Sequence, residues 1–197
     1  MNRNAEPPPF SKELVISAYC QGIFPMGDDD GTISWYSPDP RCIFDFDLFH
    51  VSSRLKRTIR QGIYDVRINT CFEEVMWACA DRESTWINEE IVRVYVELHE
   101  LGLAHSVETF FEEKLVGGLY GVSLGGAFMG ESMFFRRTDA SKVALVYLVE
   151  RLKERGFILL DTQYQNKHLA SFNSQLIARK EYLARLSRAL ELDCRFD

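Results

Sequence analysis

The sequence predicts an α+β protein with one main domain and a small N-terminal piece. Three consecutive runs, at residues 104–111, 114–122 and 127–135, have the composition of strands and are separated by short turns. Apolar residues at helical spacing occur before and after this group, so the strands cluster along the chain instead of alternating with helices. A length of 197 residues allows one substantial core and a small satellite.

The first fifty residues divide into a tail and a small subdomain. Three consecutive prolines within residues 1–10 favour an extended, solvated arm. Ser11 is placed to cap a helix that ends at Gly22, and short extended segments around prolines follow it. We therefore expect an extended tail over 1–10, a small α/β subdomain over 11–50 and a catalytic domain over 51–197.

The main domain begins with alternating short elements. Ser52 opens a basic helix, and residues 64–68 alternate as a strand. Thr70 and Glu73 have the spacing of a capping box, which predicts another helix start. Asn88 caps the helix that leads into the three-strand group. The order so far places two helices directly before the meander.

A helix, a strand and a final helix complete the predicted domain. The long amphipathic helix starts near Asp139 and ends at Gly156, a strand of buried type follows over 157–161, and residues 178–190 are helical again. This order matches acetyltransferase-like folds of the GNAT type. We expect a mixed sheet of that type with flanking helices, preceded by the small N-terminal α/β piece.

The composition indicates a globular protein of the cytoplasm. No run approaches the roughly 18 apolar residues that a membrane span requires, and the start of the sequence lacks a signal-peptide pattern. Five cysteines without a CxxC pair predict reduced thiols rather than disulfides or a zinc site. A net charge of −6 argues against indiscriminate nucleic-acid binding but leaves room for a local basic face.

No metal or cofactor site is predicted. His99 and His105 are six residues apart with Gly102 between them, whereas a zinc-binding helix needs two histidines four apart. The glycines of GGLYGVSLGG fall within and between strands, not at a strand-to-helix turn that could cradle phosphate. Residues 136–140, where a GNAT-type fold would bind the coenzyme A diphosphate, contain no glycine. Coenzyme A is therefore disfavoured.

The polar residues of the segment DTQ are candidates for chemistry. Asp161 and Gln163 are two apart at a strand end, so both side chains point to the same side of the sheet. A carboxylate and a carboxamide aimed at one spot can accept a proton from an amine and donate to a carbonyl oxygen, which suits acyl transfer to nitrogen. The competing interpretation is that Asp161 only caps the following turn.

A second candidate acid lies within the apolar run AFMGESMF. Glu131 is either a core carboxylate paired with an arginine or the binding site for a cationic group of a ligand. Three large aromatic residues, Trp77, Trp86 and Phe128, are expected in the core by residue type.

Several separated motifs resemble the leucyl/phenylalanyl-tRNA protein transferases. They are YCQGIFP, WYSPDPR, TWI, LHELGLAHSVE, LVGGLYGV, GESMF, ASK and DTQ followed by HLAS, and they extend in order from about Tyr19 to the C-terminus. The resemblance implies an acetyltransferase-like domain preceded by a smaller one, with no metal and no coenzyme A. It also implies a monomeric enzyme that moves leucine, phenylalanine or methionine from aminoacyl-tRNA to a protein N-terminus.

The resemblance carries roles for individual residues. It implies that Asp161 and Gln163 orient or deprotonate the attacking amine and that Glu131 contacts the aminoacyl group. The acceptor protein typically begins with Arg or Lys, and the product is marked for degradation by the N-end rule pathway. An aminoacyl ester is already activated, so positioning and modest proton transfer suffice without a covalent nucleophile.

The resemblance also implies a hydrophobic amino-acid pocket with unusual walls. Met26 stands where the family motif has tryptophan, and two pocket positions that are often aromatic hold leucine. Such walls predict leucine or methionine over phenylalanine. Two further departures are Phe135, where the motif has serine, and SFN where the motif has SLG. The six pocket residues transferred in this way are Met26, Trp86, Phe128, Leu148, Leu152 and Leu160.

The basic helix is the candidate tRNA contact, since the resemblance implies that charge holds the acceptor stem. Its alternative interpretation is a solvated helix face. Phosphate contacts would make recognition depend on shape rather than base sequence. The residues concerned are Arg54, Lys56, Arg57 and Arg60.

Two other functions compete with this one. The first is a GNAT-type acyltransferase with another acyl carrier, which the missing diphosphate glycines disfavour. The second is an inactive tRNA-binding or peptide-binding relative, which the presence of Glu131, Asp161 and Gln163 disfavours.

Overall fold

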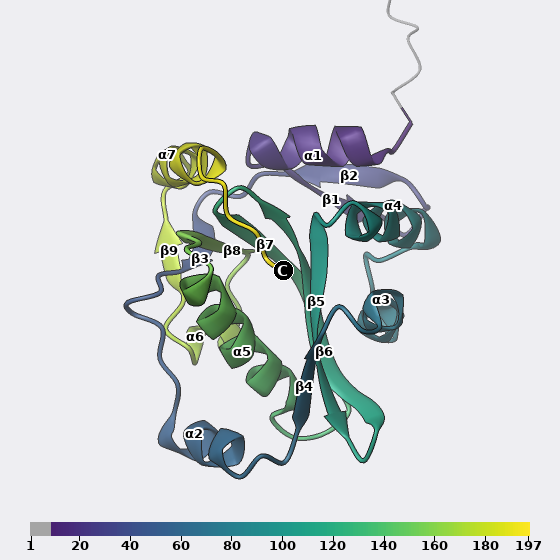
Figure 1. Ribbon diagram of the computed structural model, residues 1–197. Helices are drawn as coiled ribbons and strands as arrows, with labels where there is room; N and C mark the ends of the chain where they lie inside the picture. Colours follow the sequence, from purple (N-terminus) through teal and green to yellow (C-terminus); the bar gives the residue numbers. More distant parts are fainter. Residues whose placement is uncertain (1–8) are drawn as a thin grey trace, which may run out of the picture.

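The computed structural model describes residues 9–197 and has the predicted α+β architecture (Figure 1). A seven-stranded mixed sheet has the order β4-β5-β6-β7-β8-β3-β9, and β1 and β2 form a separate two-stranded sheet. The helices are α1 (Lys12–Cys20), α2 (Ser53–Arg60), α3 (Phe72–Ala80), α4 (Glu89–Glu100), α5 (Ala140–Glu154), α6 (Lys167–Ala170) and α7 (Arg179–Leu190). The strands are β1 (Phe24–Gly27), β2 (Ile33–Tyr36), β3 (Arg41–Phe44), β4 (Asp65–Ile68), β5 (Ala104–Phe111), β6 (Lys114–Leu124), β7 (Ala127–Phe135), β8 (Leu159–Gln163) and β9 (Gln175–Ile177).

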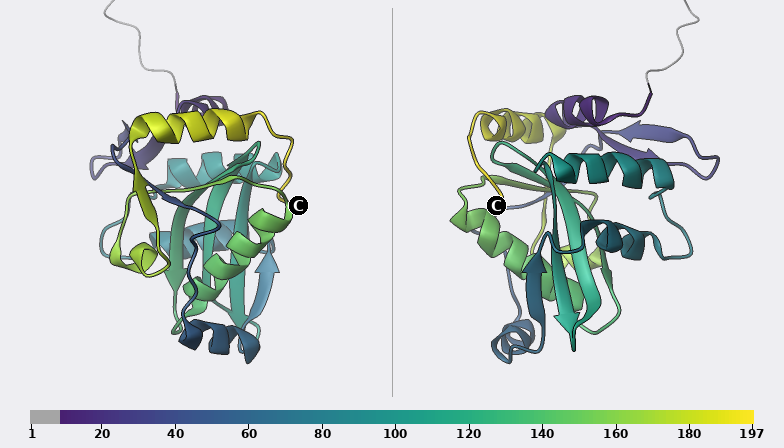
Figure 2. Two further views of the ribbon diagram at one scale, coloured as in Figure 1. Left: turned by 90° about the vertical axis from the view of Figure 1, so that its left-hand side faces the viewer. Right: turned by 45° about the vertical axis from the view of Figure 1, so that its right-hand side comes forward.

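Two apolar cores lie on opposite faces of the large sheet. Helices α3 and α4 cover one face and α5 covers the other (Figure 2). The α3 side also receives α1 and α7, which lie together at one end of the molecule. The alternation of side chains along β7 supplies both cores, since Met129 belongs to the first and Phe128 to the second.

The N-terminal piece is joined to the main sheet by one of its own strands. Ser11 caps α1 as the sequence predicts, and the side chain accepts a hydrogen bond from the backbone N–H of Leu14. Strand β3 then pairs with β8 on one side and β9 on the other. Residues 41–44 thus lie inside the large sheet, although they precede the expected boundary at residue 50. Of the expected tail, residues 1–8 lie outside the described residues, and Phe10 is buried against Trp35.

The central strands β7 and β8 separate shortly after they meet. They pair in parallel only at Ala127–Leu159, Phe128–Leu160 and Met129–Asp161. The register of β6 and β7 shifts at Tyr120/Gly121, so Glu131 forms a bulge in β7. Beyond this point the backbone edges of β7 and β8 face each other without pairing, which opens the middle of the sheet.

Two local predictions are wrong. Thr70 and Glu73 do not form a capping box, because α3 begins at Phe72 after Cys71 and Thr70 instead donates to Glu108 through its N–H and its hydroxyl, at 3.2 Å each. Trp77 is not in the core; its side chain is 42% exposed and its indole N–H donates to Glu73. Tertiary contacts override the local pattern in both places.

Candidate active site

A cavity of about 430 Å³ occupies the gap where β7 and β8 diverge. Strand β7 contributes Glu131 and Met133, strand β8 contributes Leu160 and Gln163, and helices α5 and α6 close the far side. Because the gap interrupts the sheet itself, the cavity reaches both of its faces. The divergence of β7 and β8 therefore creates a cavity that passes through the sheet, and no additional loop or domain is needed to form it.

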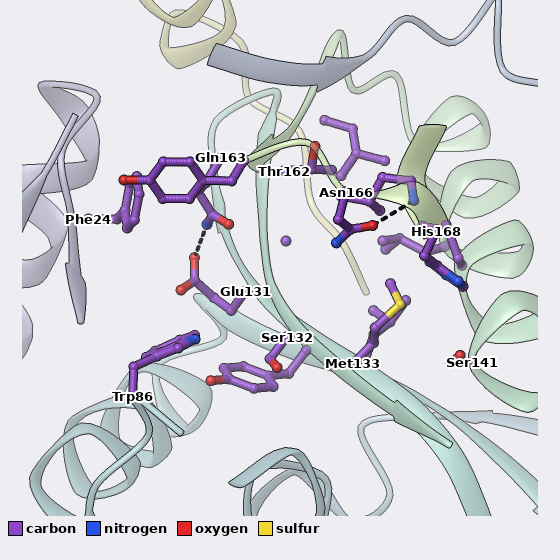
Figure 3. Close-up of a pocket in the computed structure, with 18 of the residues that line it drawn as sticks. Phe24, Trp86, Glu131, Ser132, Met133, Ser141, Thr162, Gln163, Asn166 and His168 are labelled. Atoms are coloured by element: carbon purple, nitrogen blue, oxygen red, sulfur yellow. Dashed lines mark hydrogen bonds between the residues drawn. The ribbon is translucent and has the colours of Figure 1, made fainter. Parts of the chain in front are cut away.

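The two ends of the cavity differ in chemistry (Figure 3). On the α4 side, Phe24, Trp86 and Glu131 face one another, and we call this end the acidic lobe. On the α5 side the walls are mostly aliphatic, and we call this end the apolar lobe. The apolar lobe is lined by Met133, Leu145, Leu148, Leu160 and Leu169, with Ser141 and His168 at its edge.

Glu131 is the one carboxylate among the described lining residues, and phenols and an amide surround it. Gln163 Nε2 donates to Glu131 Oε1 at 2.8 Å, and the Tyr95 hydroxyl donates to Oε2 at 3.4 Å. The Tyr95 hydroxyl also shares a hydrogen bond of 2.5 Å with the hydroxyl of Tyr19. Burial raises the pKa of Glu131 to about 8, and the nearby Asp161 carboxylate adds to the rise. The acid can therefore change its charge near neutral pH.

Asp161 is held away from the cavity by a buried ion pair. The guanidinium of Arg41 donates to it twice, Nε to Oδ1 at 2.9 Å and Nη2 to Oδ2 at 2.6 Å, and both side chains are almost fully buried. The Tyr182 hydroxyl donates to Oδ2 at 2.9 Å. Asp161 does not line the cavity. Its carboxylate thus has no free approach for a substrate amine.

The same carboxylate positions Gln163. The backbone N–H of Gln163 donates to Asp161 Oδ1 at 2.9 Å, and Gln163 has a φ of 56°, in the left-handed region that non-glycine residues rarely adopt. This backbone turn at the end of β8 directs the amide side chain across the gap to Glu131. The predicted pair Asp161 and Gln163 is therefore coupled, with the amide facing the cavity and the acid behind it.

The transferred pocket residues divide into two groups. Met26, Trp86, Leu148 and Leu160 line the cavity, the first two in the acidic lobe and the last two in the apolar lobe. Phe128 and Leu152 do not line it; both are fully buried in the core behind the apolar lobe.

Sequence reasoning missed several lining residues. Leu145 precedes Leu148 by one helical turn, so spacing could have indicated it. Met133 follows Glu131 by two positions, but the bulge at Glu131 turns the two side chains to opposite faces, so alternation could not have placed Met133. His168 had no such signal. Arg41 was also missed as a functional residue, although it ends the motif WYSPDPR, because nothing in the sequence connects it with an acid 120 residues later.

The basic helix α2 carries four cationic side chains, and one of them forms an ion pair. Lys56, Arg57 and Arg60 are exposed and make no ion pair with any described residue. Arg54 instead donates to Asp139 through both Nη atoms, at 2.6 and 2.8 Å. Three of the four predicted tRNA contacts are thus free to bind phosphate in this structure.

The start of α5 does not favour a diphosphate. Asp139 caps the helix with a left-handed backbone, and its carboxylate accepts from Arg54 and lies 3.7 Å from the ammonium of Lys142. A carboxylate at this helix N-terminus repels a phosphate group that would otherwise be attracted by the helix dipole. Within residues 9–197, no group of three or more His, Cys, Asp or Glu side chains is arranged to hold a metal ion.

An apolar lobe and a lobe with a carboxyl group meet in one cavity, so the site offers an acyl group and an amine the separate environments that an acyltransferase requires. A family model described as Leucyl/phenylalanyl-tRNA protein transferase matches residues 43–187, and one described as its N-terminal domain matches residues 9–39. The chain belongs to the leucyl/phenylalanyl-tRNA protein transferase family, and it is an aminoacyltransferase.

Relatives with that name match almost the whole chain. The protein from Gloeobacter violaceus is 57% identical over 93% of this chain and 96% of its own length. The protein from Rubrobacter xylanophilus is 55% identical over 93% of this chain and 97% of its own length. Among solved structures, L-PGS from Bacillus licheniformis is 15% identical over 81% of this chain and 55% of that chain, with a TM-score of 0.42, too distant a likeness to inform function.

Arg41→Met is expected to lower the free energy of unfolding by about 3–5 kcal/mol, because it leaves Asp161 as an unpaired buried charge. Urea denaturation at pH 7 measures the change. Lys56→Ala, which removes an exposed cation, serves as the control and should stay within about 0.5 kcal/mol of the parent. A loss below about 1 kcal/mol for Arg41→Met would show that the pair does not hold this part of the fold.

The raised pKa of Glu131 predicts a stability change with pH. Between its ordinary pKa of 4.5 and about 8 the folded protein holds a proton that the unfolded chain has released, so the stability from Glu131 is present at low pH and falls as pH rises through this window. The free energy of unfolding of the parent minus that of Glu131→Gln should therefore decrease from pH 5 to pH 8. The exposed variant Glu100→Gln should show no such trend, and a pH-independent difference for Glu131→Gln would contradict the shift.

Proposed function

We propose that the chain transfers leucine or methionine, and phenylalanine less well, from aminoacyl-tRNA to the N-terminal amine of proteins that begin with Arg or Lys. The observation that carries the proposal is the through-sheet cavity, with an aliphatic lobe on one side and a single carboxylate on the other. An apolar amino-acid side chain fits the first lobe. A cationic acceptor terminus fits the second.

Glu131 and Gln163 are the polar groups in reach of the reacting atoms. The amine nitrogen attacks the ester carbonyl, the new C–N bond forms, the C–O bond to the tRNA ribose breaks, and the ribose oxygen leaves with the proton that the amine loses. Glu131 in its ionised form takes this proton from the amine and passes it on to the ribose oxygen, a relay suited to a pKa of about 8, close to that of an α-amine. Gln163 Nε2 is free to donate to the carbonyl oxygen once Glu131 turns to the amine.

The role assigned to Asp161 is indirect. Its two oxygens accept from Arg41, Tyr182 and the backbone of Gln163, so its lone pairs are occupied and its side chain is enclosed. Asp161 therefore acts by fixing Gln163 rather than by touching the amine. Asp161 and Gln163 are therefore both needed, Gln163 to donate to the carbonyl oxygen and Asp161 to position Gln163.

The walls of the apolar lobe favour a branched or flexible aliphatic side chain. Leu145, Leu148 and Leu160 present no aromatic face on which a phenyl ring could stack. Met26 and Trp86 lie across the sheet, within reach of the ester end of the aminoacyl group rather than its side chain. The exposed cations Lys56, Arg57 and Arg60 provide phosphate contacts for the acceptor stem.

The cellular setting follows from this activity. We place the enzyme in the cytoplasm as a monomer, where its products are marked for degradation by the N-end rule pathway. No helix among the described residues is long and apolar enough to cross a membrane. Charged tRNA and protein N-termini are the only partners that the proposed reaction needs.

Transfer of labelled leucine from leucyl-tRNA to short peptides tests the function. Peptides that begin with Lys or Arg should receive label, and Glu131→Gln should reduce transfer by about 10²- to 10⁴-fold because the proton acceptor is lost. Glu100→Gln is the matched control and should keep full activity. Transfer to peptides that begin with Asp or Glu would contradict the acceptor assignment, and tRNA binding without any transfer would indicate an inactive binding relative.

Competition between charged tRNAs tests the donor side. Leucine and methionine should outcompete phenylalanine, and Leu148→Ala should raise the phenylalanine-to-leucine ratio by about tenfold because it widens the apolar lobe. Leu152→Ala is the control, since Leu152 is buried behind the lobe; it should lower stability without changing the ratio. A parent enzyme that prefers phenylalanine would overturn this account of the lobe.

A further inference from the structure

An exposed aromatic side chain stands at the rim of the cavity. Phe135 is the last residue of β7, and its side chain is 66% exposed although it lines the cavity mouth. It follows Met133 by two positions, so both project from the same face of the sheet, the face of the apolar lobe. A phenyl ring left in water beside a cavity offers an aromatic face on which a base can stack.

Two arginines follow this ring in the loop between β7 and α5. Arg136 and Arg137 are exposed, and neither makes an ion pair with any described residue. The guanidinium of Arg137 lies over the ring of Phe111 at 3.5 Å, and that of Arg136 lies 5.5 Å from the centre of Phe134. Two aromatic residues are thus followed directly by two arginines, a composition suited to a nucleic-acid strand, although Arg136 lies by Phe134, which packs into the core on the α3 side.

The loop is held in place and tied to the basic helix. Asp139 accepts the bidentate pair from Arg54 of α2, and the Tyr64 hydroxyl donates to the carbonyl of Thr138 at 2.6 Å. The backbone N–H of Arg136 donates to Val116 at 2.7 Å. Helix α2, strand β4 and the β7–α5 connection gather at the same end of the molecule (Figure 1). The β7–α5 loop at the cavity rim and helix α2 therefore lie at the same end of the molecule and are joined by the Arg54–Asp139 pair.

We propose that Phe135 and Arg137 bind the unpaired nucleotides that precede the aminoacylated 3′ residue of the tRNA. A base stacks on Phe135 and the guanidinium group of Arg137 contacts an adjoining phosphate. This inference rests on the proposed tRNA substrate and adds a site for its single-stranded end. Phe135 stands where the family motif has serine, so the stacking surface is a feature of this chain.

Charge distinguishes this strand from the acceptor protein as the occupant. An acceptor that begins with Arg or Lys is repelled by Arg137, whereas a phosphate backbone is attracted. The acid that suits a cationic terminus, Glu131, is hydrogen bonded to Tyr95 on the α4 side of the sheet, whereas Phe135 follows the alternation of Met133, which packs on the α5 side. The carboxyl group and the exposed ring therefore lie on opposite faces of the sheet.

The test compares two RNA hairpins that mimic an acceptor stem and carry no amino acid. One has four unpaired 3′ nucleotides and the other has a blunt end. Phe135→Ser should weaken binding of the first by about 5- to 150-fold, the range expected for loss of one stacked base, and leave the second unchanged. Leu101→Ser removes a similarly exposed apolar side chain elsewhere and should affect neither. Arg137→Ala should reduce the slope of log affinity against log salt concentration for the overhang hairpin by about 0.7.

Two results would overturn the inference. One is an equal loss, or no loss, for both hairpins in Phe135→Ser. The other is unchanged RNA binding with a raised KM for the acceptor peptide, which would assign the surface to the protein substrate. Binding is measured without transfer, so the outcome is separate from the proposed function. Parent protein that binds the overhang through Phe135 but transfers no leucine would support this site and refute the proposed reaction.

Discussion

The buried ion pair of Arg41 and Asp161 is the constraint on which the site depends. Arg41 begins β3, which pairs with β8, and the guanidinium also donates to the carbonyl of Gly22 at 3.1 Å in the N-terminal piece. Tyr182 brings α7 to the same carboxylate. Two buried charges are stable only when they are paired and hydrogen bonded. The acid Asp161 therefore fixes β3, the N-terminal piece at Gly22 and α7 relative to one another. That acid then holds Gln163 in a backbone conformation that turns its amide to Glu131.

The second constraint is the separation of β7 and β8, which converts a sheet into a passage. Parallel pairing ends at Met129 and Asp161, and the bulge at Glu131 turns this side chain towards α4 while Met133 faces α5. One strand thereby supplies both lobes. The proposed reaction joins an apolar acyl donor to the neutral amine of a cationic residue, and a gap in a sheet offers the two groups different environments because its two faces belong to different cores.

Sequence patterns over a few residues predicted the strand bounds and helix caps, which depend on neighbouring residues alone. The bounds of β5 and β7 and the caps Ser11, Ser52 and Asn88 follow from alternation and capping chemistry, and the structure confirms them. Glu131 and Gln163 could be singled out because polar groups in apolar strands need partners. The partner of Asp161 could not, since the pairing joins residues 120 positions apart. Nor could the sequence show that Phe128 and Leu152 lie behind the apolar lobe, because only packing decides which buried residue lines a cavity.

The central claim is that the amino-acid side chain and the acceptor amine occupy opposite faces of the sheet. A crystal structure with adenosine that carries leucine through a stable 3′ amide tests it most directly. The account predicts that the isobutyl group lies against Leu145, Leu148 and Leu160, with Glu131 left open to the acceptor side. An isobutyl group placed instead between Trp86 and Glu131 would contradict the assignment of the two lobes.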